Sequence, residues 1–228
     1  MRVITPQNPS LFWGNFLIFK TDSAICSPSE IQEIWKECFH AYPMVRHQAF
    51  IWDRLLPNDV ALSAFGAAGY ELYLTSILKA PKTLLCRDWD VRLLTRKHEL
   101  NAALDLDMVV NYQGNQNGVR NVFEKKYCNY LTSIQNEQAR WFGIYQGDLL
   151  IGSAGVLLEN DSAVIVDVQT HENNRMQGIC RTLISKILDF AGARSVYIEA
   201  DAHSLASKIY EKFGFKDLGN EVTVFKSE

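Results

Sequence analysis

The fold of this 228-residue chain is decided by one stretch, VIVDVQTHENNRMQGICR, at residues 164–181. Its first seven letters are rich in valine and alternate in the manner of a β-strand, and the polar letters that follow are typical of a loop. From Cys180 onward the apolar residues recur at helical spacing, namely at Leu183, Ile184, Ile187, Leu188 and Ala191. The stretch therefore predicts a strand, a loop and a helix, with Gly178 in the first helical turn.

Such a junction has the chemistry of a phosphate site. The first N–H groups of a helix lack intrahelical partners, and the helix dipole favours negative charge beside them. Gly178 has no Cβ, so a pyrophosphate could lie directly on the backbone, and Arg175 and Arg181 would add positive charge. Taken alone, the pattern also fits an ordinary tight turn into a helix, so both interpretations stay open at this point.

The elements on either side predict the fold class. Upstream, a hairpin is expected from strands at 141–145 and 149–158, and the chain before it predicts a strand at 91–94 and helices at 98–110 and 122–134, with 114–118 as a loop. Downstream, a strand at 195–200, a helix at 205–213 and a strand at 222–225 are expected. We therefore predict an α/β (α+β) fold, with a mixed, mostly antiparallel sheet flanked by helices.

Length and an internal echo predict two domains, 1–86 and 87–228. At about 150 residues per domain the chain is one and a half domains long. Residues 80–88, which contain Pro81, are typical of a connection. A helix, a glycine–aromatic pair and a strand occur in this order at 60–78 and again at 205–225. Residues 1–86 are thus expected to be a partial copy of the second domain, although this arrangement is also a common generic one.

Composition excludes several classes of protein. With 47% apolar and 21% charged residues the chain is globular, and a net charge of −3 argues against a nucleic-acid binder. There is no run of 18 uncharged apolar residues, and Leu11–Phe19 is a poor signal peptide, so no membrane partner is expected. Five widely spaced cysteines without a C-x-x-C pair indicate reduced thiols in a cytoplasmic protein without a metal site. The aromatic residues Trp13, Phe16, Phe19 and Trp35 are expected in the core of the first domain.

Two signatures resemble those of the GNAT superfamily of N-acetyltransferases. Arg175-x-x-Gly178-x-Cys180 is similar to the acyl-CoA loop of that superfamily, and Ala206-x-x-Ile209-Tyr210-x-x-x-Gly214-Phe215 resembles its second signature. One helix and one strand intervene, as in the superfamily, and the resemblance covers residues 87–228. The opening segment, Asn8–Phe16, also resembles the start of an uncharacterised bacterial branch of the superfamily.

The resemblance implies acetyl-CoA as co-substrate and assigns roles to individual residues. It implies that the end of the key strand offers backbone groups to pantetheine and to the acyl carbonyl, one N–H stabilising the oxyanion. It implies Tyr210 as the general acid for the CoA thiolate. The cofactor-binding residues that it implies are Val168, Gln169, Thr170, Arg175, Met176, Gln177, Gly178, Ile179, Cys180, Arg181 and His203.

Two positions depart from the family pattern. Cys180 stands where a glycine or alanine is usual, and His203 stands where many members have an asparagine that contacts pantetheine. Cys180 is still small, so phosphate access is expected to survive, whereas the pantetheine contact of His203 is in doubt. A helix N-terminus would lower the pKa of the Cys180 thiol, yet direct transfer needs no cysteine nucleophile.

The acceptor amine must lose a proton, because an alkylammonium has a pKa of about 10. Asp167 is the preferred base since it lies on the key strand, and Glu172 and His171 are alternatives. Strand alternation places Asp167, Gln169 and His171 on one face, unless a bulge resets the pattern. Which face lines the substrate groove stays open.

These inferences together predict an acetyl-CoA-dependent N-acetyltransferase that acts by direct transfer to a primary amine. The alternatives are a catalytically silent module that binds acyl-CoA and regulates a partner, and a scaffold without cofactor. The acceptor is open among polyamines, amino acids, antibiotics, peptide N-termini and protein lysines, since variable loops choose it. The first domain is expected to shape the acceptor pocket, and a monomer and a homodimer are both compatible with the sequence.

Overall fold

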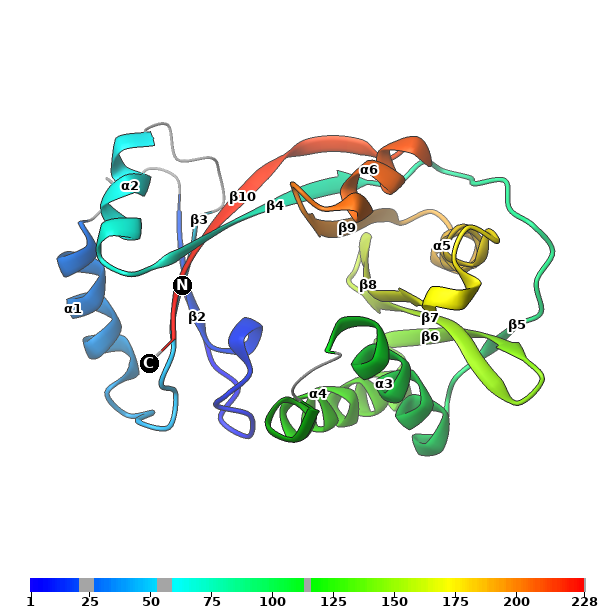
Figure 1. The fold of residues 1–228 in the computed structure, drawn as a ribbon, viewed down its shortest axis with the longest axis horizontal. Helices are drawn as coiled ribbons and strands as arrows, with labels where there is room; N and C mark the ends of the chain where they lie inside the picture. The colour runs from blue at the N-terminus through cyan, green and yellow to red at the C-terminus, as the bar shows by residue number, and fades with distance from the viewer. Residues whose placement is uncertain (21–26, 53–58, 113–115, 228) are drawn as a thin grey trace. The chain divides into compact units, whose positions relative to one another are not determined.

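A computed structural model describes residues 1–20, 27–52, 59–112 and 116–227 (Figure 1). The chain forms two compact units, and each contains segments that are distant in sequence. The first unit comprises Met1–Ile77, Ala200–Lys208 and Asp217–Glu228, and the second comprises Leu78–Glu199 and Ile209–Lys216. Strand β4 and helix α6 thus each pass from one unit to the other. The division into two domains between residues 86 and 87 stays a prediction.

The first unit is a small α/β layer. Its strands are β1 (Arg2–Val3), β2 (Phe16–Phe19), β3 (Gln48–Trp52), β10 (Lys216–Lys226) and β4 (Glu71–Lys79), adjacent in that order. Strands β2 and β3 are parallel, whereas β1–β2 and β10–β3 are antiparallel. The helical elements are η1 (Phe12–Gly14), α1 (Pro28–Phe39) and α2 (Asp59–Ala67). Helix α1 begins at a capping box in which Ser27 and Glu30 bond each other's backbone N–H groups.

The core of the first unit is aromatic. Trp35 stacks on Phe39 at 3.8 Å between ring centroids, and Trp52 lies 5.3 Å from the ring of Phe19. The buried members of this core are Leu17, Ile31, Trp35, Phe39, Val45, Phe50, Trp52, Phe65, Tyr70 and Val224. The prediction that Trp13 belongs to this core is wrong. Its side chain is 52% exposed, because η1 turns it outward.

The second unit holds a mostly antiparallel sheet with helices on both faces. Its strands are β9 (Ser195–Asp201), β8 (Ser162–Thr170), β7 (Leu149–Leu158), β6 (Ala139–Gln146) and β5 (Val91–Leu93), adjacent in that order. Among these described strands, β8–β9 is the one parallel pair and the other neighbours are antiparallel. Helices α3 (Lys97–Asn111) and α4 (Gln116–Gln135) lie on one face of the sheet and α5 (Ile179–Ala191) on the other, with η2 (Glu172–Asn174) before α5 and α6 (Leu205–Lys212) after β9 (Figure 1). The predicted fold class is confirmed.

One expected loop is partly helical. Residues 114–118 were predicted to connect two helices, but α4 already begins at Gln116. A glycine costs only about 1 kcal/mol in a helix, and the first turn tolerates it because its N–H groups have no intrahelical partner in any case. Residues 113–115 lie outside the described residues.

The internal echo seen in the sequence has the same geometry at both places. After α2, the Tyr70 N–H donates to the Phe65 carbonyl at 3.0 Å, and Gly69 has φ +81°. After α6, the Phe215 N–H donates to the Tyr210 carbonyl at 3.1 Å, and Gly214 has φ +90°. Both turns are helix C-caps in which a left-handed glycine lets the following aromatic residue close the last turn. The glycines are required there by the positive φ.

Two further expectations concern the described residues alone. None of the described helices combines the length and the apolar character needed to cross a membrane. The described cysteines Cys38, Cys86, Cys128 and Cys180 are all free thiols. Cys26 lies outside the described residues.

The contact between β6 and β7 predicts a sharp packing effect at Gly155. A Cβ there would overlap the six-membered ring of Trp141, which is completely buried. We expect Gly155→Ala to lower the free energy of unfolding by about 1–3 kcal/mol, because the ring must shift within a packed core. Thermal and urea unfolding would measure the loss.

Gly66→Ala is the matched control, since no atom lies within 4 Å of a Cβ built at that exposed position in α2. We expect it to be neutral or stabilising by about 0.5–1 kcal/mol through helix propensity. Equal effects of the two substitutions would contradict the role assigned to Trp141.

Candidate active site

The site is built along strand β8, where its partner on one side stops pairing. The parallel ladder between β8 and β9 runs from Ser162↔Ser195 to Ile165↔Ile198 and then ends, although β8 continues to Thr170. On its other side β8 remains paired with β7 as far as Thr170↔Gly152. The edge of β8 from Val166 to Thr170 therefore presents backbone groups that no neighbouring strand uses. This is the separation of strands that the family resemblance implies.

A β-bulge lies within the same segment. Gly155 pairs with Val166 and Ser153 with Gln169, so Asp167 and Val168 together face Ala154. Asp167 accordingly has φ +48°, in the left-handed region that non-glycine residues rarely adopt. The bulge that the strand pattern left open is thus present. It directs the Asp167 carboxylate against helix α4.

The Asp167 carboxylate binds the ammonium group of a lysine. Lys126 Nζ lies 2.8 Å from Asp167 Oδ1, and the two side chains are only 20% and 18% exposed. The same ammonium lies over the rings of Phe123 and Tyr130, at 5.1 Å and 5.4 Å from their centroids. A carboxylate and two aromatic faces together make a binding site for a primary ammonium ion.

A second carboxylate, that of Asp107, interacts with the charge of Asp167. Asp107, on α3, is 2% exposed and accepts hydrogen bonds from Asn111 Nδ2 at 2.7 Å and from the Tyr127 hydroxyl at 3.3 Å. Burial raises the pKa of Asp107 above its ordinary value, the Asn111 hydrogen bond opposes this, and the charge of Asp167 raises it further. The sequence interpretation missed Asp107. The sequence does contain a signal for Asp107. It is an acidic residue among apolar neighbours, and the spacing of four residues places it on the same helix face as Ala103 and Asn111.

Two tyrosines complete the lining of this cluster. Burial raises the pKa of Tyr127 and of Tyr130 well above the ordinary tyrosine value, and the negative charge of Asp167 adds to the effect in both. Both phenols therefore stay protonated and can act as hydrogen-bond donors. Gln169 is also buried, and its side-chain carbonyl accepts a hydrogen bond from the Ser153 hydroxyl at 3.4 Å.

The phosphate loop has the geometry expected of an anion site. After η2, Met176 has φ +63° with its side chain 98% exposed, and Gly178 is the N-cap of α5 with φ +88°. The first intrahelical bond runs from the Thr182 N–H to the Gly178 carbonyl at 2.9 Å. The N–H groups of Ile179, Cys180 and Arg181 are thus left without helical partners.

An arginine from a distant segment lies against this loop. A Cβ on Gly178 would come within 3.2 Å of Arg87 Cδ. The segment around Arg87 is attached to α5 by the Thr182 hydroxyl, which donates to the Arg87 carbonyl at 3.1 Å, and by Trp89 Nε1, which donates to the Gln177 carbonyl at 3.3 Å. Arg87 is a candidate phosphate ligand that sequence reasoning missed, because no local motif connects residues 91 positions apart (178 minus 87).

Polar atoms without partners gather at the same place. Among the residues described by the structure, four buried side-chain atoms form no hydrogen bond: Trp141 Nε1, Asp167 Oδ2, Thr170 Oγ1 and Arg181 Nε. Two of them lie on the open segment of β8, and a third lies in the first turn of α5. Buried polar groups are nearly always paired with protein, water or ligand, so the three atoms on β8 and α5 are available to a ligand bound along this edge.

The pKa values of Tyr210 and Cys180 are both raised in the folded protein. Tyr210 is 6% exposed, and its pKa is raised first by burial and then by the neighbouring Cys180. Burial raises the pKa of the Cys180 thiol to about 12, so the expected lowering by the helix N-terminus is overridden. Both groups stay protonated at neutral pH.

The remaining predicted positions have these surroundings. His203 lies between β9 and α6, where it is exposed and its backbone N–H donates to Asp201 Oδ1 at 2.7 Å. His171 accepts the Asn173 N–H on its ring at 3.4 Å, and Glu172 is exposed. The second unit thus brings together Asp167, the end of β8 and the phosphate loop. His203 belongs to the first unit.

Comparison with known proteins identifies the family. The sequence matches the acetyltransferase (GNAT) domain family over residues 109–225, which is half of the chain, so the protein belongs to the GNAT acetyltransferases. Members of this family transfer acetyl groups from acetyl-CoA. No curated protein matches the chain at a significant level.

Solved structures share the fold at low sequence identity. A functionally unknown conserved protein from Staphylococcus epidermidis is similar over 100% of this chain and 91% of its own, with TM-score 0.83 and 18% identity. A GCN5-related N-acetyltransferase from Kribbella flavida covers 87% of this chain and 76% of its own, with TM-score 0.58 and 14% identity. One from Sphaerobacter thermophilus covers 87% and 66%, with TM-score 0.57 and 13% identity.

The buried carboxylate of α3 predicts a pH dependence of stability. Because the folded-state pKa of Asp107 is raised, the wild type loses stability as the pH rises from about 3.8, the ordinary pKa of Asp, through the higher folded value. Asp107→Asn stays neutral and escapes this loss. We expect the stability of the variant relative to wild type to increase with pH across that window, as measured by urea unfolding at several pH values.

Asp105→Asn removes a carboxylate from the same helix at a 59% exposed position and serves as the control. Because solvent surrounds that side chain, its removal should change stability by about 1 kcal/mol at most. A relative stability of Asp107→Asn that fell with rising pH would contradict the assignment.

Proposed function

We propose that this protein is an N-acetyltransferase that moves an acetyl group directly from acetyl-CoA to a primary amine. One observation carries the proposal: the open edge of β8 has an ammonium-binding carboxylate at its bulge and a phosphate loop at its end. On this proposal the two halves of the acetyl-transfer site lie along β8 and the loop that follows it. The family supports the chemistry in general, and the residues below give it a mechanism.

The co-substrate is expected to lie along β8 and reach the first turn of α5. Backbone groups of Val168, Gln169 and Thr170 would hold the pantetheine arm, and one of their N–H groups would stabilise the oxyanion that forms when the amine attacks. The pyrophosphate would lie on residues 176–181, with Arg175, Arg181 and Arg87 as cations. His203 stays a predicted pantetheine contact.

The ammonium site supports an amine as the acceptor. Lys126 shows that the position beside Asp167 accepts a primary ammonium ion, at 2.8 Å from the carboxylate and over two aromatic rings. An acceptor ammonium would displace or join Lys126 there. Its proton would pass to Asp167, for which the unpaired Oδ2 is free to accept it, with Asp107 behind as a second carboxylate.

Transfer then needs no covalent intermediate on the protein. The neutral amine nitrogen forms a bond to the thioester carbon, the carbon–sulfur bond breaks, and the Tyr210 hydroxyl gives its proton to the departing thiolate. The bonded nitrogen then loses its second proton to water, and water returns a proton to the Tyr210 phenolate, so that the amide, the free thiol and the original hydroxyl result. Cys180 is no competitor as a nucleophile, because a thiol with a pKa of about 12 is almost wholly protonated at neutral pH.

A second candidate function is a silent module that binds acyl-CoA and regulates a partner. The same ion pair favours it, since Lys126 already occupies the position beside Asp167 that an acceptor ammonium would need. Both functions need the phosphate loop. Release of free thiol from acetyl-CoA in the presence of a panel of amines distinguishes them, because a silent module gives none.

The acid role predicts the effect of Tyr210→Phe. We expect kcat for thiol release to fall by about 100-fold or more, because general acid catalysis contributes about 10²–10⁴-fold. Thermal stabilisation by CoA should persist, since the phosphate loop is intact.

Tyr197→Phe on β9 removes a phenol from the same unit, at a half-buried position where the ring lies under Lys79, and should leave kcat within about twofold. Unchanged turnover in Tyr210→Phe would remove Tyr210 from the mechanism.

The phosphate loop predicts the effect of a methyl group at Gly178. Bound ligand stabilises a protein by about 2.7 kcal/mol at a hundredfold excess over Kd, so wild type should show a clear rise of Tm with CoA. In Gly178→Ala the methyl group lies against Arg87 in the anion cradle, and we expect most of this rise to be lost.

Gly192→Ala is the matched control, because Gly192 also has positive φ, at the other end of α5, with open space around it. It shares the backbone strain but should keep the full CoA-dependent rise of Tm. Equal loss in both variants would mean that strain, and not phosphate access, explains the effect.

A further inference from the structure

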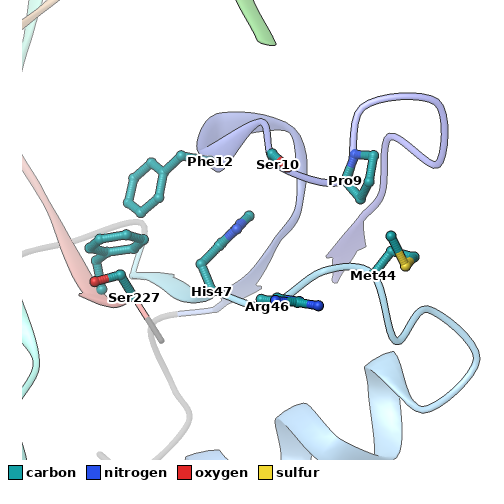
Figure 2. A pocket seen from close by; sticks show the side chains of 8 residues that line it. Pro9, Ser10, Phe12, Met44, Arg46, His47 and Ser227 are labelled. Carbon is teal, nitrogen blue, oxygen red and sulfur yellow. The ribbon is translucent and has the colours of Figure 1, made fainter. Parts of the chain in front are cut away.

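The first unit contains a pocket that the acetyl-transfer site does not use. Its volume is about 640 Å³, within the roughly 300–1,000 Å³ typical of small-molecule sites. Figure 2 shows side chains from three separate segments around it. The lining residues are Pro9, Ser10, Phe12, Met44, Arg46, His47, Phe225 and Ser227. Three of these lie in the opening segment Asn8–Phe16, to which the transfer mechanism assigns no role.

One wall of the pocket is rigidly organised by a single buried amide. Asn15 is fully buried; its Oδ1 accepts the Thr5 N–H at 2.9 Å, and its Nδ2 donates to the carbonyls of Asn8 at 3.0 Å and Leu11 at 2.9 Å. The Asn15 carbonyl is in turn 3.1 Å from His47 Nε2. The loop is thus held in one shape by hydrogen bonds rather than by core packing. Such preorganisation lowers the entropy cost of binding a ligand.

The same region keeps large apolar side chains at the surface. Met44 is 66% exposed and Trp13 is 52% exposed. Phe12 contacts the ring of Phe225 edge to face at 3.9 Å between centroids, and Trp13 contacts Phe12 in the same way at 4.5 Å. These side chains offer an apolar and aromatic surface to a ligand.

The charge in the pocket is positive and unpaired. Arg46 is exposed, and within the described ranges of the chain it forms no ion pair. None of the described residues that line the pocket carries a carboxylate. Burial lowers the pKa of His47, and hydrogen bonds to the Asn15 and Phe12 carbonyls act in the opposite direction. His47 is therefore predominantly neutral at pH 7, and the positive charge of the pocket comes from Arg46. A guanidinium group free on an apolar wall favours a carboxylate, which it can bind with two parallel hydrogen bonds.

We propose that this pocket binds a small organic acid, in which a carboxylate pairs with Arg46 and an aromatic or branched apolar body lies against Phe12, Phe225 and Met44. The hydroxyl groups of Ser10 and Ser227 are available to the carboxylate or to polar substituents. The site belongs wholly to the first unit, so the proposal does not depend on the acetyl-transfer function.

Titration of the full-length protein with defined acids tests the proposal. The probes are 3-phenylpropionate, indole-3-acetate and 4-methylpentanoate, and their binding is followed by calorimetry and, for the first and last, by the intrinsic tryptophan fluorescence of the protein. We expect saturable binding of at least one acid, with 3-phenylpropan-1-ol and 3-phenylpropylamine binding about tenfold or more weakly than 3-phenylpropionate if that acid binds. The reason is that both analogues keep the apolar body but lose the carboxylate.

Variants identify the residue that supplies the charge. We expect Arg46→Gln to weaken binding of the acid by about 10- to 100-fold, the range for losing charge-assisted hydrogen bonds. Lys36→Gln removes an exposed positive charge from α1 of the same unit and should change the affinity less than about twofold. Met44→Ser, at an exposed position, should weaken the acid and the alcohol alike.

The possible results of these experiments either support the proposal or overturn it. Binding of an acid that depends on Arg46 and not on Lys36, and that persists with saturating CoA present, supports the proposal. It is overturned if none of the three acids binds saturably, if the amine binds as well as the acid, or if Arg46→Gln and Lys36→Gln have equal effects. Circular dichroism and the Tm of each variant establish that the fold is retained in the comparison.

Discussion

The early end of the β8–β9 ladder is the constraint on which the second unit depends. Two parallel strands that stop pairing at Ile165 and Ile198 leave backbone donors and acceptors facing a gap, and buried groups of this kind cost free energy unless something pairs with them. The bulge at Asp167, the loop that turns into α5 and the unpaired Thr170 Oγ1 and Arg181 Nε are arranged along this edge. A thioester ligand with its own carbonyl, amide and phosphate groups is chemically suited to satisfy such an edge.

The acidic cluster beside the bulge balances charge against burial. Asp167 pairs with Lys126 at 2.8 Å, and Asp107 is influenced by the charge of the same lysine, in surroundings made of Tyr127, Tyr130 and Phe123. Isolated buried charges are strongly disfavoured, so the lysine stabilises the pair of carboxylates when no acceptor is bound. In the proposed mechanism the same lysine competes with the acceptor ammonium. The proposal therefore couples the affinity for the acceptor to the free energy needed to displace Lys126 or to accommodate a second cation beside it.

The two units contain the same type of helix C-cap, although its surroundings differ between them. Both have a helix that ends at a left-handed glycine, with the next aromatic residue bonded back to a carbonyl five residues earlier, at Phe65–Tyr70 and at Tyr210–Phe215. In the second unit this turn follows the helix of Tyr210, whose pKa is raised by burial and by the charge of Cys180. In the first unit it closes an aromatic core, and the pocket with the unpaired Arg46 lies in another part of that unit, between the opening segment, the residues after α1 and the end of β10.

The sequence by itself determined the order of elements, including the strand of Asp167, the loop of Gly178 and the helix of Tyr210, because strand alternation and helical spacing are local properties that act over a few residues. The roles of these residues in acetyl transfer stay predictions. The sequence misplaced the start of α4 and the surroundings of Trp13, since a glycine is tolerated in a first helical turn and one 3₁₀ turn reverses the face of a side chain. Only the tertiary structure decided that Asp107 on α3, Lys126 on α4 and Asp167 on β8 form one cluster, that Arg87 lies against Gly178, and that burial overrides the helix N-terminus at Cys180. These results depend on contacts between residues far apart in the chain and on exclusion of water, and neither is encoded in the spacing of a motif.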